Sequence, residues 1–191
     1  ATGPSTASVT DALLDAVMRY RDDPLGFVMF IFPWGEVGGP LEGEDGPDVW
    51  QRDFLRDLGR EIRARGVDEA LGSVLMATAS GHGVGKTTLI AWVIIWFMSV
   101  HRHPVVTVTA NTADQLSSTT WRELSIWHGW SLNTDWFTWT ATTFSMKGAP
   151  EKWRASAVPW SKERPEGFQG KHSPHMLMIF DEASKIEDSI W

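Results

Sequence analysis

A glycine-rich segment at residues 79–88, ASGHGVGKTT, carries the clearest chemistry in the chain. Gly85, Lys86 and Thr87 fit the pattern G-x-x-x-x-G-K-[ST], with Ser80 in place of the first glycine. Glycines at alternate positions let the backbone curl until successive N–H groups point at phosphate oxygens, and a helix after them adds its positive end. The predicted nucleotide-binding residues are Ser80, Gly81, His82, Gly83, Val84, Gly85, Lys86, Thr87 and Thr88.

The side chains that end this segment suit ATP and Mg²⁺ as cofactors. Lys86 can neutralise charge on the β- and γ-phosphates, and the Thr87 hydroxyl can bind the metal. Thr88 is expected to serve as a helix residue rather than as a second metal ligand. The alternative is a glycine-rich turn between a strand and a helix that binds nothing, but the order strand, loop, helix favours nucleotide binding.

A second motif, MLMIFDEAS at residues 176–184, is an apolar run that ends in two carboxylates. If the run is a parallel strand, Asp181 lies at its carboxyl end, where ligands bind in such sheets. Asp181 would then hold Mg²⁺, and Glu182 would polarise the attacking water, so that Glu182 and Lys86 are the predicted catalytic residues. The alternative is that the pair starts a loop or caps the next helix.

These motifs must be positioned by an alternating set of elements. We expect a helix over residues 9–20, ended by Pro24 and Gly26, and a helix from Asp48 to Gly66. The core-facing residues predicted for the second helix are Trp50, Phe54, Leu58 and Ile62. Further on we expect buried strands at 74–78, 105–110 and 176–180, shorter strands at 136–146 and 153–158, and helices at 87–100 and 111–130.

Apolar strands separated by helices indicate an α/β fold of three layers with a mostly parallel sheet. The predicted division is a helical N-terminal segment, residues 1–70, and a nucleotide-binding core, residues 71–191. The 191-residue chain has no cysteine, which excludes disulfides and thiolate metal sites and favours an intracellular protein. No apolar run is long enough for a membrane span, and the N-terminal residues ATGPSTASVTDALLDAV lack the basic start and apolar core of a signal peptide.

The net charge of −7 lies entirely in residues 1–70, whereas residues 71–191 carry equal numbers of acidic and basic side chains. Static coating of nucleic acid needs clustered Lys and Arg, so this charge disfavours it. It leaves open a motor that grips DNA through a local patch.

Four stretches together resemble the large terminase subunit of tailed bacteriophages, the ATPase that packages DNA. They are ASGHGVGKT, VTANTADQL with TWREL, FQGKHSPHMLMIFDEAS, and FPWG with PDVWQRDFL, and they span residues 20–191. The resemblance implies a P-loop NTPase fold of the additional-strand Glu (RecA-like) class and ATP hydrolysis coupled to translocation of double-stranded DNA into a procapsid. It implies a homo-oligomeric ring, a portal protein and a small terminase subunit as partners, and a virus-encoded protein in the host cytoplasm with no membrane contact.

The resemblance also implies roles for residues outside the two motifs. Gln51, with Trp50 beside it, would read adenine, although Asp48 and Gln51 also have the spacing of a capping box. Family members have an arginine for the γ-phosphate within the loop or from a neighbouring subunit, and here the loop has His82. A neighbour's Arg154 or Arg164 is therefore expected, although solvated surface charge is the commoner meaning of such a basic run. The lysines that could instead face DNA are Lys147, Lys152, Lys162 and Lys171.

Other polar residues carry less weight in the sequence. His101, His103, His172 and His175 are best explained as loop histidines, because no third ligand has metal-site spacing. Asn111 suits either the cleft or a turn. Since the chain stops nine residues after Glu182, we expect a truncated motor fragment with weak turnover. The alternatives are a helicase-like ATPase, which would need a second lobe, and an assembly module that binds ATP without hydrolysing it, which would not need Glu182.

Overall fold

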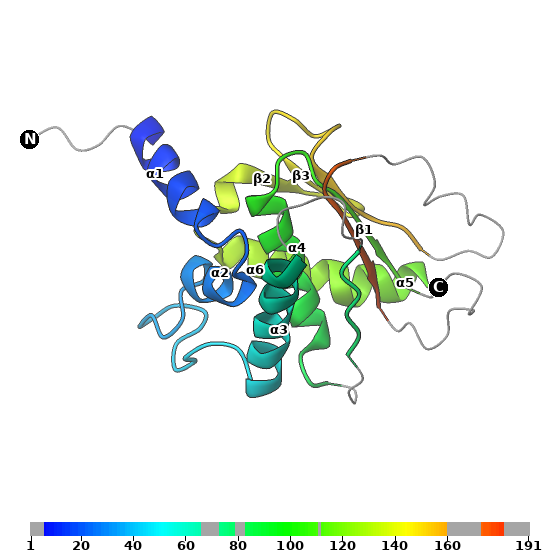
Figure 1. Cartoon of the computed structure of the whole chain (residues 1–191), viewed down its shortest axis with the longest axis horizontal. Coiled ribbons are helices and arrows are strands. Elements are labelled where there is room, and N and C mark those ends of the chain that lie inside the picture. Colours follow the sequence, from blue (N-terminus) through cyan, green and yellow to red (C-terminus); the bar gives the residue numbers. More distant parts are fainter. Residues whose placement is uncertain (1–5, 66–72, 79–82, 111, 160–172, 182–191) are drawn as a thin grey trace, which may run out of the picture. The chain divides into compact units, whose positions relative to one another are not determined.

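The structure, a computed structural model, describes residues 6–65, 73–78, 83–110, 112–159 and 173–181, with side chains from residue 11 onward. The chain divides into two compact units, which Figure 1 traces in sequence colours. Unit 1 comprises residues 1–84 and 131–133, and unit 2 comprises residues 85–130 and 134–191. None of the helices in the described ranges combines the length and the apolar character that crossing a membrane requires.

Unit 1 contains the helices α1 (Thr6–Met18), α2 (Pro24–Ile31) and α3 (Val49–Arg65). α1 confirms the helix predicted over residues 9–20. α1 ends at Met18, and the residues predicted to end it, Pro24 and Gly26, lie in the first turn of α2. Pro24 is tolerated there because the first N–H groups of a helix have no partner within it. Asp23 caps that turn by accepting the Gly26 N–H at 3.0 Å.

The buried face of α3 differs from the prediction. Its buried residues are Gln51, Leu55 and Gly59, one position along from the expected stripe of Trp50, Phe54, Leu58 and Ile62, which are only half-buried. Gly59 explains the offset. A Cβ there would lie 3.1 Å from both the Asp22 carbonyl oxygen and Pro24 Cδ, so the start of α2 packs against the one position of α3 that has no side chain.

The strand predicted at 74–78 is wrong. Residues 73–78 have no regular secondary structure, and Leu75, expected in the core, is 85% exposed. The strands of the described chain all belong to unit 2. Since a strand is stable only when its backbone groups pair with a neighbour, an apolar run in the described part of unit 1 has no ladder to join.

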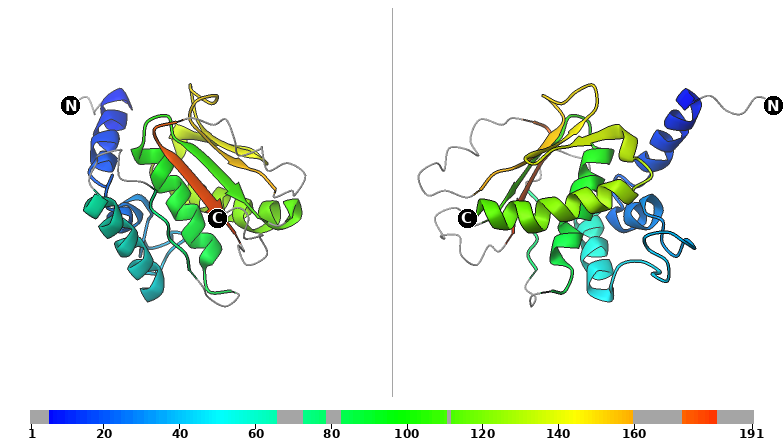
Figure 2. Two further views of the ribbon diagram at one scale, coloured as in Figure 1. Left: turned by 45° about the vertical axis from the view of Figure 1, so that its right-hand side comes forward. Right: turned by 180° about the vertical axis from the view of Figure 1, so that it is seen from behind.

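Unit 2 is built on one open sheet of five strands in the order β2-β3-β4-β1-β5 (Figure 2). β1 pairs in parallel with both β4 and β5, while β3 pairs antiparallel with β2 and β4. The strands are β1 (Val105–Thr109), β2 (Phe137–Trp139), β3 (Thr143–Met146), β4 (Arg154–Ala157) and β5 (Met176–Phe180). The α/β class and the strands at 105–110 and 176–180 are confirmed, and the region 136–146 is a hairpin rather than a single strand.

Position at the sheet edge changes the burial of β5. The continuous apolar run MLMIF predicts a strand covered on both sides, yet Met176 and Met178 are 50% and 41% exposed. β1, which has a neighbour on each side, buries four of its five residues. The apolar sequence therefore identifies β5 as a strand but does not reveal that it is an edge strand among the described residues.

Two helical runs complete unit 2. α4 (Lys86–Val100) is apolar around its whole circumference and largely buried. The second run joins α5 (Ala113–Gln115), the π-helix η1 (Leu116–Trp121) and α6 (Arg122–Trp130), and a 3₁₀ turn, η2 (Thr134–Trp136), comes after it. Figure 2 shows the run 113–130 as one continuous rod, as predicted for residues 111–130. Thr112 caps it by accepting the Gln115 N–H at 3.1 Å.

The π-helix in this run has a local cause. The Ser118 and Thr119 hydroxyls each donate at 2.5 Å, to the carbonyl oxygens of Asp114 and Gln115, and Ser117 donates to Asp114 at 3.2 Å. Such back-bonding competes with the N–H groups that would close α-helical turns. The SSTT segment therefore favours the wider π geometry, a form found mostly as single turns near functional sites.

Candidate functional site

Two glycines precede α4 in a conformation that other residues rarely adopt. Gly83 and Gly85 have φ values of +77° and +82°, a left-handed conformation that side chains disfavour. Gly85 is the N-cap of α4 and supplies no side-chain cap, and the positive end of a helix favours an anion. Lys86 and Thr87 are the first two residues of this helix. Ser80, Gly81 and His82 lie outside the described residues.

Asp181 directly follows β5, as predicted. Its backbone N–H donates to the Thr109 carbonyl oxygen at 2.8 Å, which continues the parallel ladder by one step. The residue is only 8% exposed, and its Oδ2 accepts the Thr120 hydroxyl at 2.5 Å. A carboxylate therefore lies buried at the carboxyl ends of β1 and β5. Glu182, the predicted base, lies outside the described residues, as does Asn111.

A second carboxylate anchors the first turn of α4. The Thr88 hydroxyl donates to Glu123 Oε1 at 2.7 Å, and Trp127 Nε1 donates to the same oxygen at 2.9 Å. The Trp127 ring also meets Trp92 of α4 edge to face, with centroids 4.9 Å apart. Glu123 thus connects α4 to α6 at the end of α4 that begins with Lys86.

These contacts bring the two sequence motifs to one stretch of helix. Thr120, in η1, and Glu123, in α6, are three residues apart in the continuous run 113–130. Thr120 contacts Asp181, and Glu123 contacts Thr88. The strand-end carboxylate and the first turn of α4 therefore attach to neighbouring positions of the same helix.

The side chains at this edge fit a hydrated magnesium ion. Asp181 Oδ1 receives no hydrogen bond from the described residues, and the buried Thr109 Oγ1 likewise has no partner among them. The described residues contain no group of three His, Cys, Asp or Glu side chains suited to a metal. Mg²⁺ needs no such cage, because one or two protein oxygens suffice when waters and phosphate oxygens supply the rest. Thr87 and Asp181 are residues that could hold it.

Thr120 and Glu123 are site residues that the sequence patterns did not single out. A signal was present, because Leu116, Thr120, Leu124 and Trp127 fall on the buried side of the run. A hydroxyl within such a stripe needs a hydrogen-bond partner. The identity of that partner depends on β5, a strand far along the chain.

Gln51 and Trp50 belong to unit 1. Gln51 Oε1 accepts the Asp48 backbone N–H at 2.9 Å, and the residue is 4% exposed. Gln51, at the third helical position of α3, therefore makes its half of the capping box. Contact of Gln51 and Trp50 with adenine stays a prediction.

The structure does not bring Arg154 to Asp181 of the same chain. Arg154 is the first residue of β4 and pairs in register with Val105, the first residue of β1, whereas Asp181 follows the last register pair, Thr109 and Phe180. The two lie at opposite ends of the parallel strands, about 15 Å apart along the strand direction. Arg154 contacts Glu151 at 4.0 Å instead. Arg164, with Lys162, Lys171 and His172, lies outside the described residues.

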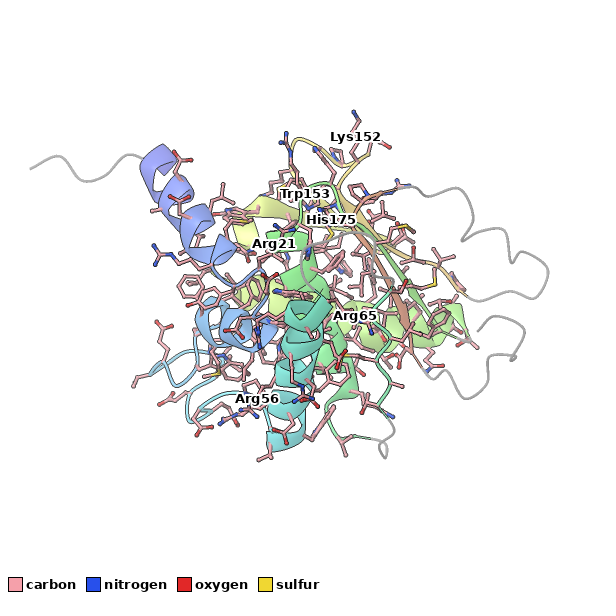
Figure 3. All side chains as sticks on the ribbon, in the orientation of Figure 1. Arg21, Arg56, Arg65, Lys152, Trp153 and His175 are labelled. Atoms are coloured by element: carbon pink, nitrogen blue, oxygen red, sulfur yellow. The ribbon has the colours of Figure 1, made fainter. Side chains whose placement is uncertain are left out.

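The histidines gather at the end of the sheet away from Asp181, and Figure 3 shows His175 there with Trp153 and Lys152. The His101 and His175 rings are 4.7 Å apart, and His103 packs against Trp153 at 5.4 Å. His101, His103 and His175 lie in loops, as expected, and their rings pack against other rings.

Two hydrogen bonds attach parts of the candidate site to the helical run 113–130: Thr88, in the first turn of α4, bonds to Glu123, and Asp181 bonds to Thr120. The chain was compared with protein-family models, with curated proteins and with solved structures, and none of the three comparisons yields a match.

Proposed function

We propose that this chain is the ATPase motor domain of a terminase large subunit, which couples ATP hydrolysis to translocation of double-stranded DNA into a procapsid. One observation carries the ATPase part of the proposal. Asp181 and the first turn of α4 are hydrogen-bonded to Thr120 and Glu123, neighbours on one helix. A Mg·ATP site needs both a phosphate-binding helix start and a carboxylate for the metal. A glycine segment that served only as a turn would need no such carboxylate.

Each residue of the proposed site has a defined task. The backbone N–H groups at the start of α4 and the Lys86 ammonium bind the phosphates. Thr87 and Asp181 hold Mg²⁺, which supplies charge neutralisation on the β- and γ-phosphates when bound. Glu182, next in the chain after Asp181, would accept a hydrogen bond from the attacking water and polarise it.

The DNA-packaging part of the proposal depends on the resemblance of the quoted motifs. It includes the portal protein, the small terminase subunit and a ring of identical chains as partners, and the host cytoplasm as location. The opposite-end position of Arg154 favours its use on a neighbouring copy's nucleotide over its own. Lys147 and Lys152 lie in and after the turn that follows β3, with Lys147 Nζ 4.0 Å from Asp135, and they are candidates for DNA phosphates.

Isothermal titration of the chain with Mg·ATP tests the proposal directly. The expected result is saturable binding by the native chain and strongly weakened binding by Asp181→Asn, because the amide cannot replace a carboxylate as a metal ligand. Lys152→Ala, a cationic position at the other end of the sheet, serves as the matched control and should bind as the native chain does. A folded native chain that shows no Mg·ATP binding would end the proposal.

Phosphate release with added nucleic acid separates the motor from its rivals. Stimulation by double-stranded DNA is the expected result. Stimulation by single-stranded DNA alone would favour the helicase-like alternative. Tight ATP binding without any phosphate release, in an oligomer that persists, would favour the assembly module.

A further inference from the structure

Thr120 makes the most deeply buried polar contact of the candidate site. The residue is fully buried, and its hydroxyl donates to Asp181 Oδ2 at 2.5 Å, across 61 positions of sequence. Asp181 Oδ1 receives no hydrogen bond from any described residue. Asp181 Oδ2 is thus hydrogen-bonded within the protein, and Oδ1 can contact a ligand.

The π-helix η1 presents Thr120 in this position. The hydroxyls before it, at residues 117–119, bond to helix carbonyls and support the wide turn. After it, Trp121 is fixed from two sides, since its Nε1 donates to the Thr140 carbonyl at 2.7 Å and its own carbonyl accepts Trp139 Nε1 at 3.2 Å. Conversion of the π turn to an α-helix would rotate Thr120 relative to Trp121 and to β5.

We propose that Thr120 is the positioning residue of the metal-binding carboxylate, and that the π turn places its hydroxyl against Asp181. This inference rests on the proposed function, because it assumes that Asp181 holds Mg²⁺. A hydrogen bond from a buried hydroxyl orients a carboxylate so that its other oxygen faces the cation, and loss of such outer partners costs metal sites about 10- to 100-fold in affinity. Thr120 itself touches neither metal nor nucleotide.

Magnesium titration in the presence of ATP, followed by calorimetry, tests the role of Thr120. Thr120→Val removes the hydroxyl and keeps the shape, and it should raise the Mg²⁺ concentration for half-saturation about tenfold. Its affinity for ATP without metal should equal that of the native chain. Thr120→Ser, which restores the donor, should return the half-saturation concentration to within about twofold of the native value.

A threonine outside η1 provides the matched control. Thr138→Val makes the same substitution at an exposed position of β2, at the edge of the sheet opposite β5, and it should leave the Mg²⁺ midpoint unchanged. A Thr120→Val variant with the native midpoint, in a chain that binds Mg·ATP, would overturn the inference alone. A folded native chain that binds no Mg·ATP would overturn the proposed function and this inference with it.

A measurement without ligand tests the contact itself. Urea unfolding of Thr120→Val, Asp181→Ala and the double variant should give non-additive changes in midpoint, because each single change already breaks the same hydrogen bond. Additive changes would overturn the inference. If Thr120→Val does not fold, Thr120→Cys takes its place in both experiments, since a thiol keeps the size but is a weak donor.

Discussion

The two ends of the parallel strands in unit 2 use their polar groups in opposite ways. At the carboxyl ends of β1 and β5, Asp181 is buried and hydrogen-bonded by the side chain of Thr120. At the amino ends, Trp153 Nε1 donates to the Met98 carbonyl at 2.8 Å, and Ser173 donates to the His103 carbonyl at 2.9 Å. His101 Nδ1 similarly lies 3.2 Å from the Phe97 carbonyl oxygen.

The difference shows which end is organised for a ligand. At the amino end, side-chain donors satisfy main-chain carbonyls, so the polar groups hold loops in place. At the carboxyl end, the Thr120 side chain donates to Asp181 Oδ2, while Oδ1 receives no hydrogen bond from the described residues. Burial of a polar group is costly unless it is hydrogen-bonded; Asp181 has one described side-chain donor, Thr120, and this supports the proposed cation site.

The largest expected effect is on hydrolysis at the carboxyl end. Glu182→Gln should lower the rate of single-turnover phosphate release about 1000-fold, because an amide cannot polarise the attacking water as a carboxylate does. Mg·ATP affinity should stay near the native value. A Gln variant that hydrolyses ATP at the native rate would show that Glu182 is not the base.

Affinity for Mg·ATP should depend on Lys86, at the carboxyl ends of the parallel strands, and not on Lys152, at their amino ends. Lys86→Ala should weaken Mg·ATP binding about 100-fold, since a charge-assisted contact to phosphate contributes roughly 3 kcal/mol. Calorimetric titration measures the change. Equal losses in Lys86→Ala and Lys152→Ala would contradict the difference between the two ends.

The anchor between α4 and α6 should contribute to stability. Glu123→Ala removes the acceptor of both Thr88 and Trp127 and should lower the free energy of unfolding by about 2 kcal/mol, or roughly 1 kcal/mol for each lost hydrogen bond. Glu151→Ala is the control, because that carboxylate is 89% exposed and its ion pair with Arg154 is long. Urea denaturation compares the two, and equal losses would show that Glu123 is no anchor.

A change at the amino end should alter stability without altering the site. Trp153→Phe keeps a ring against His103 but removes the hydrogen bond to the Met98 carbonyl. The expected cost is about 1 kcal/mol of unfolding free energy, with Mg·ATP affinity unchanged. A loss of affinity in this variant would show that the two ends are coupled.

The smallest expected effect is a pH dependence away from both strand ends. Burial lowers the pKa of His128 below its usual 6.5, with a smaller contribution from Lys147, although the hydrogen bond to Thr134 and the Asp135 charge oppose the change. Because the unfolded chain then binds the proton more readily, this histidine stabilises the fold fully above pH 6.5 and progressively less as pH falls below that value. Urea midpoints between pH 7.5 and 5.5 should fall less steeply in His128→Gln; identical slopes would contradict the assignment.

Local patterns in the sequence were sufficient for much of the fold. The apolar runs at 105–110 and 176–180 predicted β1 and β5, and the helices expected at 87–100 and 111–130 correspond to α4 and to the run 113–130. The apolar pattern at 74–78 wrongly predicted a strand. A strand depends on a neighbour for its hydrogen bonds, and no pattern within five residues reveals whether that neighbour exists.

By itself the sequence determined the chemistry available to this protein, because residue type and spacing settle which groups can bind phosphate or a metal. Only the tertiary structure decided which groups meet. The contact of Thr120 with Asp181, and that of Glu123 with Thr88, join positions 61 and 35 residues apart. Such pairings follow from how helices pack on a sheet, and the physical reason is that burial of polar groups is satisfied by neighbours in space rather than by neighbours in the chain.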